Sequence, residues 1–217
     1  MPRANTLKRQ KSRTALLGAF VLILIITLVT TAVMNIFREK PAPKLSNIDA
    51  TNYENYIAPL VILDVSPFAS VAKASQDQLL LSSIWSVLLS KDASKYEYAD
   101  DGRMILPQTD VDASYQNLFG SLPKHKSISS EGPAFDYSSA DKCYYIPVQG
   151  IESSFSPHIV SSKKVGNDIA LTVEYIPQDN WQEDSSGKTV PAKANKKMIY
   201  TIEKTASKMK IISILKG

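Results

Sequence analysis

The stretch HIVSSKKVGNDIALTVEYI, residues 158–176, decides the fold, because it reads as two strands joined by a tight turn. Gly166 and Asn167 separate two extended runs, and both residue types are favoured in hairpin turns. Apolar side chains occupy alternate positions of the second run, at Ile169, Leu171, Val173 and Tyr175. Because side chains alternate across a strand, the pattern predicts a hairpin with one buried face.

A second strong hairpin lies nearer the C-terminus, in KKMIYTIEKTASKMKIISIL, residues 196–215, with its turn near Ala206 and Ser207. Its last run, 211–215, is apolar on both faces. Two hairpins are predicted earlier in the chain: one over 96–106, with a good turn signal at Asp101 and Gly102, and a weaker one over 134–148. The two consecutive C-terminal hairpins together predict a four-stranded antiparallel meander.

Helices are predicted ahead of these hairpins. Thr51 and Glu54 have capping-box spacing and begin a short helix over 52–58, which Pro59 is expected to end or kink. Another helix, over 111–118, follows a cap at Thr109 or Asp110.

The strongest helix prediction covers residues 76–89. Ser75 and Gln78 form a second capping box at its start. Apolar residues cover most of its circumference, which indicates a buried helix. Its weak polar side is made of Ser82, Ser83 and Ser86.

Helices early in the chain and an antiparallel meander late predict an α+β fold. We expect the long helix at 76–89 to pack in the concavity of the bent sheet. This is the arrangement of NTF2-like and cystatin-like domains, and such a likeness of fold carries no function by itself.

Ahead of this domain lies an uncharged run, 14–37, between Arg13 and Arg38. Its 24 residues would cover roughly 36 Å as a helix, enough for a hydrocarbon core of about 30 Å. A cleaved signal peptide is the alternative, but its apolar region usually covers only about 7–15 residues. The run therefore predicts a retained transmembrane helix.

Flanking charges predict the orientation of this helix. Five Lys or Arg residues precede it and three follow closely, which favours a cytoplasmic N-terminus. The predicted organisation is a basic cytoplasmic tail (1–13), the transmembrane helix (14–37), a linker (38–48) and an extracytoplasmic domain (49–217).

The sequence pI of about 9.0 does not indicate a nucleic-acid partner. Residues 1–40 carry a net charge of +6, whereas residues 41–217 carry −2. The basic character thus belongs to the flanks of the membrane run, where it suits a lipid surface.

The stretch APLVILDVSPFASVAKASQDQLLLSSIW, residues 58–85, carries a family resemblance. It resembles a pattern in uncharacterised single-pass membrane-anchored proteins of Clostridia-type bacteria. The matching residues are Pro59, Asp64, Pro67, Phe68 and Trp85. The resemblance extends over about residues 50–217 and implies a membrane-anchored outer domain, but it implies no known activity.

Chemistry-bearing residues are sparse. His125 lies between two lysines and His158 lies at the start of a strand, so they are interpreted as surface or strand-edge histidines. Cys143 is the single cysteine. No zinc-binding, serine-hydrolase or phosphate-loop motif occurs in the sequence. Asp110 and Asp112 are interpreted as residues of a helix start. We therefore expect no catalytic residues, no metal and no cofactor.

Binding residues are predicted at three places. Trp181, in the polar loop QDNWQEDSSGK, either grips a partner or folds back on the sheet. A basic face for a partner is predicted at Lys196, Lys197, Lys208 and Lys210, with a simple solvated strand face as the alternative. A pocket behind the long helix would be lined by Trp85, Tyr175 and Tyr200.

These patterns lead to one main hypothesis. The chain is expected to be a non-enzymatic, membrane-anchored envelope protein whose outer domain binds another protein or assembles into a complex. The first alternative is an extracytoplasmic domain that binds or senses a small ligand. A less favoured alternative is an envelope hydrolase, which requires clustered carboxylates or a histidine in a cleft.

Overall fold

The computed structural model describes residues 46–129, 134–147, 154–178, 182–187, 189–190, 193–205 and 208–217. These residues belong to a single compact unit. The predicted transmembrane run and Trp181 lie outside them. Within the described ranges, none of the helices combines the length and apolar composition that a bilayer crossing requires.

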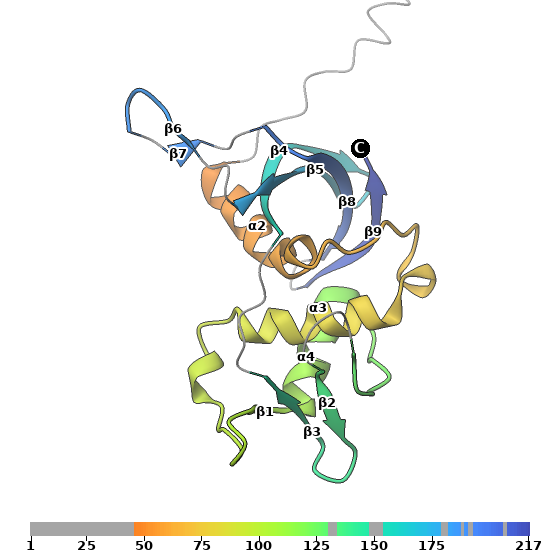
Figure 1. Cartoon of the computed structure of the whole chain (residues 1–217). Helices are drawn as coiled ribbons and strands as arrows, with labels where there is room; N and C mark the ends of the chain where they lie inside the picture. Colours follow the sequence, from red (N-terminus) through yellow and green to blue (C-terminus); the bar gives the residue numbers. More distant parts are fainter. Residues whose placement is uncertain are drawn as a thin grey trace, which may run out of the picture. The chain divides into compact units, whose positions relative to one another are not determined.

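The main sheet confirms the predicted meander. Its four strands are β4 (Phe155–Val165), β5 (Asp168–Pro177), β8 (Lys196–Lys204) and β9 (Met209–Lys216). They pair antiparallel in the order β4-β5-β8-β9. Gly166 adopts a φ of 63° in the first turn, which explains the glycine there. The four strands curl strongly, as Figure 1 shows.

Helix α2 (Asn47–Ile62) packs against the concave side of this sheet. We expected the helix at 76–89 in this place, and that expectation is wrong. Pro59 predicts an end or a kink of the helix at that position, whereas it lies inside α2. The helix thus starts within the predicted linker, is longer than predicted, and buries Ile57 and Leu60 completely.

One core joins α2 to the sheet. Its fully buried members include Ile57, Leu60, Val61, Leu171, Val173, Tyr175, Tyr200, Ile202, Ile211 and Ile214. Burial of this apolar surface is the main stabilising term of the fold.

The edges of the main sheet are partly capped by other segments. On the β4 edge, the Ile159 N–H donates to the Glu54 carboxylate of α2 at 2.8 Å. On the β9 edge, Phe68 and Ile214 exchange two backbone hydrogen bonds of 2.7 and 2.9 Å. Such caps protect strand edges from pairing with other chains.

Helix α3 (Gln76–Leu88) begins at the predicted capping box, where the Ser75 hydroxyl accepts from the Gln78 N–H. The expected polar side is wrong for Ser82 and Ser83, which are fully buried. Their hydroxyls donate to carbonyls one turn earlier, at 2.7 and 3.0 Å, which satisfies them without water. α3 can therefore lie between two cores.

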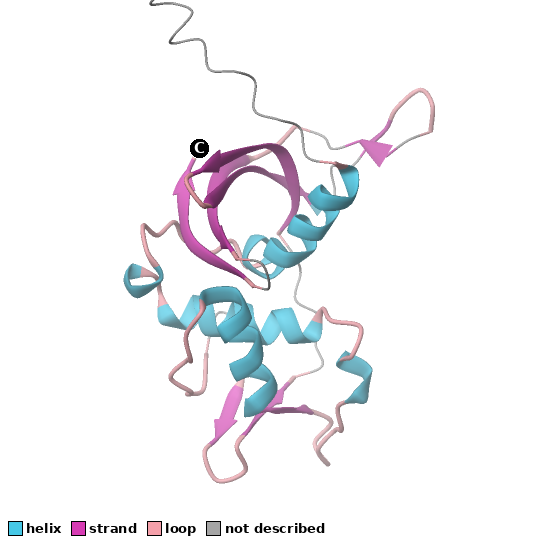
Figure 2. Ribbon diagram, turned by 180° about the vertical axis from the view of Figure 1, so that it is seen from behind, coloured by secondary structure: helices cyan, strands magenta, loops and turns pink. Residues whose placement is uncertain are grey.

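The second core joins α3 to α4 (Gln108–Phe119) and a small sheet (Figure 2). The small sheet has the order β1-β3-β2, from β1 (Met104–Pro107), β2 (Asp136–Ser138) and β3 (Cys143–Ile146). α4 begins after Pro107 rather than at the expected cap, and Gly120 ends it with a φ of 75°.

Short elements complete the described residues. They are two 3₁₀ turns, Val71–Lys73 and Ala93–Lys95, and a two-stranded pair of β6 (Gln182–Glu183) with β7 (Thr189–Val190). Three helices and antiparallel sheets confirm the α+β class.

Candidate functional site

Tyr175 and Tyr200 meet inside the concave side of the main sheet. Their hydroxyl oxygens lie 2.5 Å apart, and neither residue is exposed. Burial raises the pKa of Tyr175 to about 12 and raises the pKa of Tyr200 well above its usual value. The two rings fill space that the predicted pocket would need.

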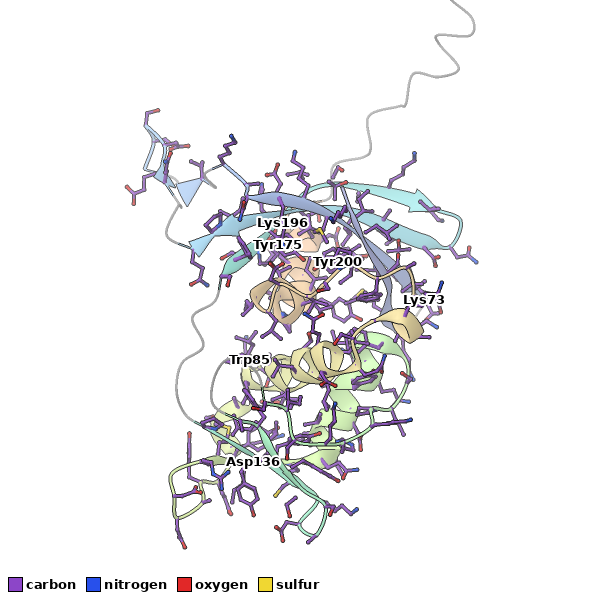
Figure 3. All side chains as sticks on the ribbon, turned by 45° about the vertical axis from the view of Figure 1, so that its right-hand side comes forward. Lys73, Trp85, Asp136, Tyr175, Lys196 and Tyr200 are labelled. Carbon is purple, nitrogen blue, oxygen red and sulfur yellow. The ribbon has the colours of Figure 1, made fainter. Side chains whose placement is uncertain are left out.

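Trp85 is not part of this pair. It lies on α3 and packs against the second core, apart from Tyr175 and Tyr200 (Figure 3). Its indole N–H is buried and has no hydrogen-bond partner among the described residues. The structure therefore brings together two of the three predicted pocket residues and leaves the third elsewhere.

Lys196, one of the predicted basic residues, is held at the end of α2. Its ammonium group forms an ion pair with Asp64 and lies 4.9 Å from the ring centroid of Tyr175. The ring of Phe155 lies 5.4 Å away, so the lysine also makes cation–π contacts. These contacts hold Lys196 against the end of α2 and the first strand of the main sheet.

Asp64 is itself strained. Its φ is 49°, in the left-handed region that glycine prefers. The Asp64 N–H donates to the Val61 carbonyl at 3.1 Å, and the Val65 N–H donates to the Leu60 carbonyl at 3.0 Å. This is a Schellman ending with aspartate in the place of glycine. The ion pair with Lys196 offsets the unfavourable carboxylate at a helix C-terminus.

The other three predicted lysines differ in whether they are paired with a carboxylate. Lys197 pairs with Glu174 at 2.9 Å, and Lys210 pairs with Glu203 at 3.0 Å. Lys208 is exposed beside the turn between β8 and β9. Three of the four lysines are therefore paired with carboxylates, and they do not form one uncompensated basic face.

His125 belongs to a partly buried polar network that the sequence did not reveal. Its Nε2 lies 2.9 Å from the Asp112 carboxylate, and its Nδ1 lies 2.8 Å from the Tyr144 hydroxyl. The His125 side chain is only 11% exposed, so its expected place on the surface is wrong. A neutral ring that donates from Nε2 and accepts at Nδ1 satisfies both partners.

Two more side chains extend this network. The Tyr137 ring stacks on His125 with centroids 5.1 Å apart. The Tyr137 hydroxyl donates to the Gln108 amide oxygen at 2.5 Å, and the Gln108 amide nitrogen donates to Asp112 at 3.3 Å. The network therefore joins the small sheet to α4.

The order carboxylate, imidazole and hydroxyl is also that of a nucleophile triad. However, the Tyr144 residue that supplies the hydroxyl is fully buried. A substrate atom cannot reach an oxygen in that position. The network is therefore interpreted as a set of contacts that holds the small sheet against α4, rather than as an active site.

The open face of the small sheet presents a different arrangement. Arg103 binds Asp101 through Nε and Asp136 through Nη1, both at 2.7 Å. Its guanidinium lies 5.0 Å from the ring centroid of Tyr145. These hydrogen bonds from the Arg103 backbone and side chain lower the pKa of Asp101.

The strand register places further residues on this face. Tyr145 pairs with Ile105 of β1 on one side and with Asp136 of β2 on the other. Because side chains alternate, they lie opposite the face of Leu106, which is fully buried in the second core. Ile105 and Tyr145 are half-buried. We call Arg103, Ile105, Asp136 and Tyr145 the Arg103 surface.

A hollow lies at one end of the main sheet, between the β4–β5 turn and the β8–β9 turn. Its volume is about 740 Å³. Its lining residues are Lys164, Val165, Gly166, Asn167, Asp168, Glu203, Lys204 and Thr205. It is open at the surface and carries both signs of charge, which suits a polar contact rather than an apolar ligand.

In the part of the chain that the structure describes, no three His, Cys, Asp or Glu side chains lie close enough to hold a metal ion. No protein-family model, curated protein or solved structure matches the chain.

Proposed function

We propose that the chain is a single-pass membrane protein whose outer domain, 49–217, binds another protein of the cell envelope and performs no catalysis. The Arg103 surface is the observation that carries this proposal. Residues 14–37 serve as the anchor, with the N-terminus in the cytoplasm.

The chemistry of the Arg103 surface supports protein binding. Arginine and tyrosine are enriched among the residues that contribute most to binding energy at interfaces. Arg103 is already fixed by two carboxylates and an aromatic ring, so it loses little conformational freedom when a partner binds. The opposite face of the same sheet packs on the second core, which makes the surface rigid.

The finer fold assignment is part of the proposal. The curled four-stranded sheet with a helix against its concave side supports a cystatin-like or NTF2-like arrangement. The tyrosine pair occupies the place where an apolar ligand would bind in such a domain. Protein binding is therefore favoured over the alternative of a ligand-binding or sensing domain.

The test is photo-crosslinking of the full chain in its native cells. A photoreactive amino acid replaces Ile105, and a control chain carries it in place of Leu122, which is 66% exposed. We expect one recurrent partner protein from position 105, absent from position 122. The Arg103→Ala change is expected to remove most of that adduct.

Two outcomes would contradict the proposal. One is an absence of protein adducts at position 105 while the chain is present in the membrane. The other is the same set of adducts from both positions, which would show only random encounters.

A further inference from the structure

The start of α2 and the turns of the main sheet lie at the same end of the domain. The Tyr53 hydroxyl, in the first half of α2, lies 3.4 Å from the ammonium group of Lys204, beside the β8–β9 turn. At the other end of the helix, Asp64 pairs with Lys196, where β8 begins. The helix therefore begins on the side where the two hairpins turn.

This end of the domain is basic, although residues 41–217 as a whole are acidic. The turn segments 163–168 and 203–210 hold five lysines and two acids, a net charge of +3. Including Asp49, from the first turn of α2, leaves +2. The lysines are Lys163, Lys164, Lys204, Lys208 and Lys210. We call the described residues of these segments, 163–168, 203–205 and 208–210, the turn end.

The turn end also exposes an apolar side chain beside its hollow. Val165 is 52% exposed, directly after Lys164, at the tip of the β4–β5 hairpin. Lys164 and Lys204 both line the hollow. Glu203, the acid nearest to Lys204 in sequence, is already paired with Lys210. A basic rim around an apolar tip is a pattern that suits an anionic bilayer surface.

Chain length brings this end close to the bilayer if the proposed anchor holds. The anchor ends at Phe37 and α2 begins at Asn47, after Ser46. The eight residues 38–45 span at most about 30 Å when fully extended. The part of the domain nearest to the start of α2 is therefore the part that can reach the headgroups.

We propose that the turn end binds the phosphates of anionic lipid headgroups in the membrane that holds the anchor. This inference rests on the proposed function, because it needs the anchor at 14–37. The lysine ammonium groups bind the lipid phosphates, and the Val165 side chain enters the interfacial layer. The domain then lies on the membrane with a fixed end, rather than rotating freely on its linker.

The experiment uses the full chain in lipid nanodiscs, with an environment-sensitive fluorophore on Val165→Cys. Cys143 is buried and stays unlabelled. In discs in which about one lipid in three is phosphatidylglycerol, we expect the fluorophore to show a blue-shifted emission and to be quenched by spin-labelled lipid. In pure phosphatidylcholine discs we expect the emission of a fluorophore in water. The same label on Leu122→Cys is expected to report water in both discs.

Charge removal gives the quantitative part of the test. Each lysine near an anionic surface is expected to change the ratio of docked to undocked domain about fivefold. The test variant combines Lys164→Gln, Lys204→Gln and Lys208→Gln. The matched control loses the same charge at exposed positions elsewhere, by Lys91→Gln, Lys124→Gln and Lys216→Gln. Only the test variant is expected to lose the blue shift.

The outcomes separate the two proposals. If the chain fails to enter nanodiscs and is extracted by alkaline carbonate, the anchor and the proposed function are wrong. If the chain is inserted but the label at 165 reports water in both discs, the lipid inference alone is wrong. A shift caused by inorganic phosphate in phosphatidylcholine discs would overturn lipid docking in favour of free-anion binding.

Discussion

Removal of one hydroxyl from the buried tyrosine pair is expected to cost more than removal of both. The hydroxyls of Tyr175 and Tyr200 lie 2.5 Å apart, inside a core where neither residue is exposed. Tyr200→Phe leaves the hydroxyl of Tyr175 buried without a partner, which costs about 1–3 kcal/mol. The double Phe variant has no such orphan and keeps nearly the same shape, so its cost is below about 1 kcal/mol.

The assay is urea unfolding of the full chain in detergent micelles, with tryptophan fluorescence as the readout. Tyr98→Phe is the matched control, because Tyr98 is 57% exposed, and it is expected to change the free energy of unfolding by less than about 0.5 kcal/mol. Single changes at 175 and 200 that add in the double variant would refute the reasoning. They would mean that the tyrosines are solvated in an open pocket rather than paired in a packed core.

The same pair predicts an alkaline limit to stability. Burial raises the pKa of Tyr175 to about 12, above the value near 10 of an unfolded tyrosine. A raised folded pKa stabilises the domain below pH 10 and this stabilisation is lost as pH rises from 10 through 12. We expect the double Phe variant to lose less stability than wild type over this range, as measured by urea midpoints.

Three further changes test other parts of the structure, each by urea unfolding of the full chain. The hydrogen bond from the Tyr96 hydroxyl lowers the pKa of Asp110, so this bond stabilises the domain above about pH 4 and its contribution is lost as pH falls further. Tyr96→Phe should therefore reduce the fall in the free energy of unfolding below about pH 4, and an unchanged fall would contradict this. His125→Ala leaves the buried Tyr144 hydroxyl without its histidine partner, whereas Asp112 keeps its bond from Gln108, and should cost about 1–3 kcal/mol; a neutral result would mean that the ring is solvated. Asp64→Gly should stay within about 1 kcal/mol of wild type, because relief of the left-handed φ offsets the lost ion pair with Lys196, whereas Asp64→Ala should cost about 1–2 kcal/mol; equal costs would exclude strain.

Local sequence signals predicted the hairpins well. The turn at Gly166 and the alternation before Tyr175 are properties of neighbouring residues, and the strands β4 and β5 follow them. The capping box at Ser75 is likewise local, and α3 begins there. Such signals act through backbone geometry within a few residues, so they can be read from one sequence.

Local signals could not predict which of the two helices packs against the concave side of the main sheet. Both α2 and α3 are apolar enough to be buried, and the decision depends on which one contacts Leu171 and Tyr200. Pro59 made α2 look short, although its missing N–H removes only one hydrogen bond from a helix that packing otherwise stabilises.

The polar contacts of the candidate sites were also hidden. Asp64 and Lys196 are 132 positions apart, and the two partners of His125 come from α4 and β3. The lysines beside His125 indicated a surface loop, which the buried ring contradicts. The Arg103 surface had a partial local signal in the Asp101 turn, but its contact with Tyr145 depends on strand pairing.

Both proposals rest on an anchored chain whose domain lies outside the membrane, and one labelling measurement tests this most directly. The chain with Leu122→Cys is treated in intact cells with a membrane-impermeant maleimide; the position is 66% exposed, and the buried Cys143 provides an unreactive reference. We predict that position 122 is labelled in intact cells and that the labelled chain stays in the membrane after alkaline carbonate. Labelling only after lysis, or release by carbonate, would contradict the account.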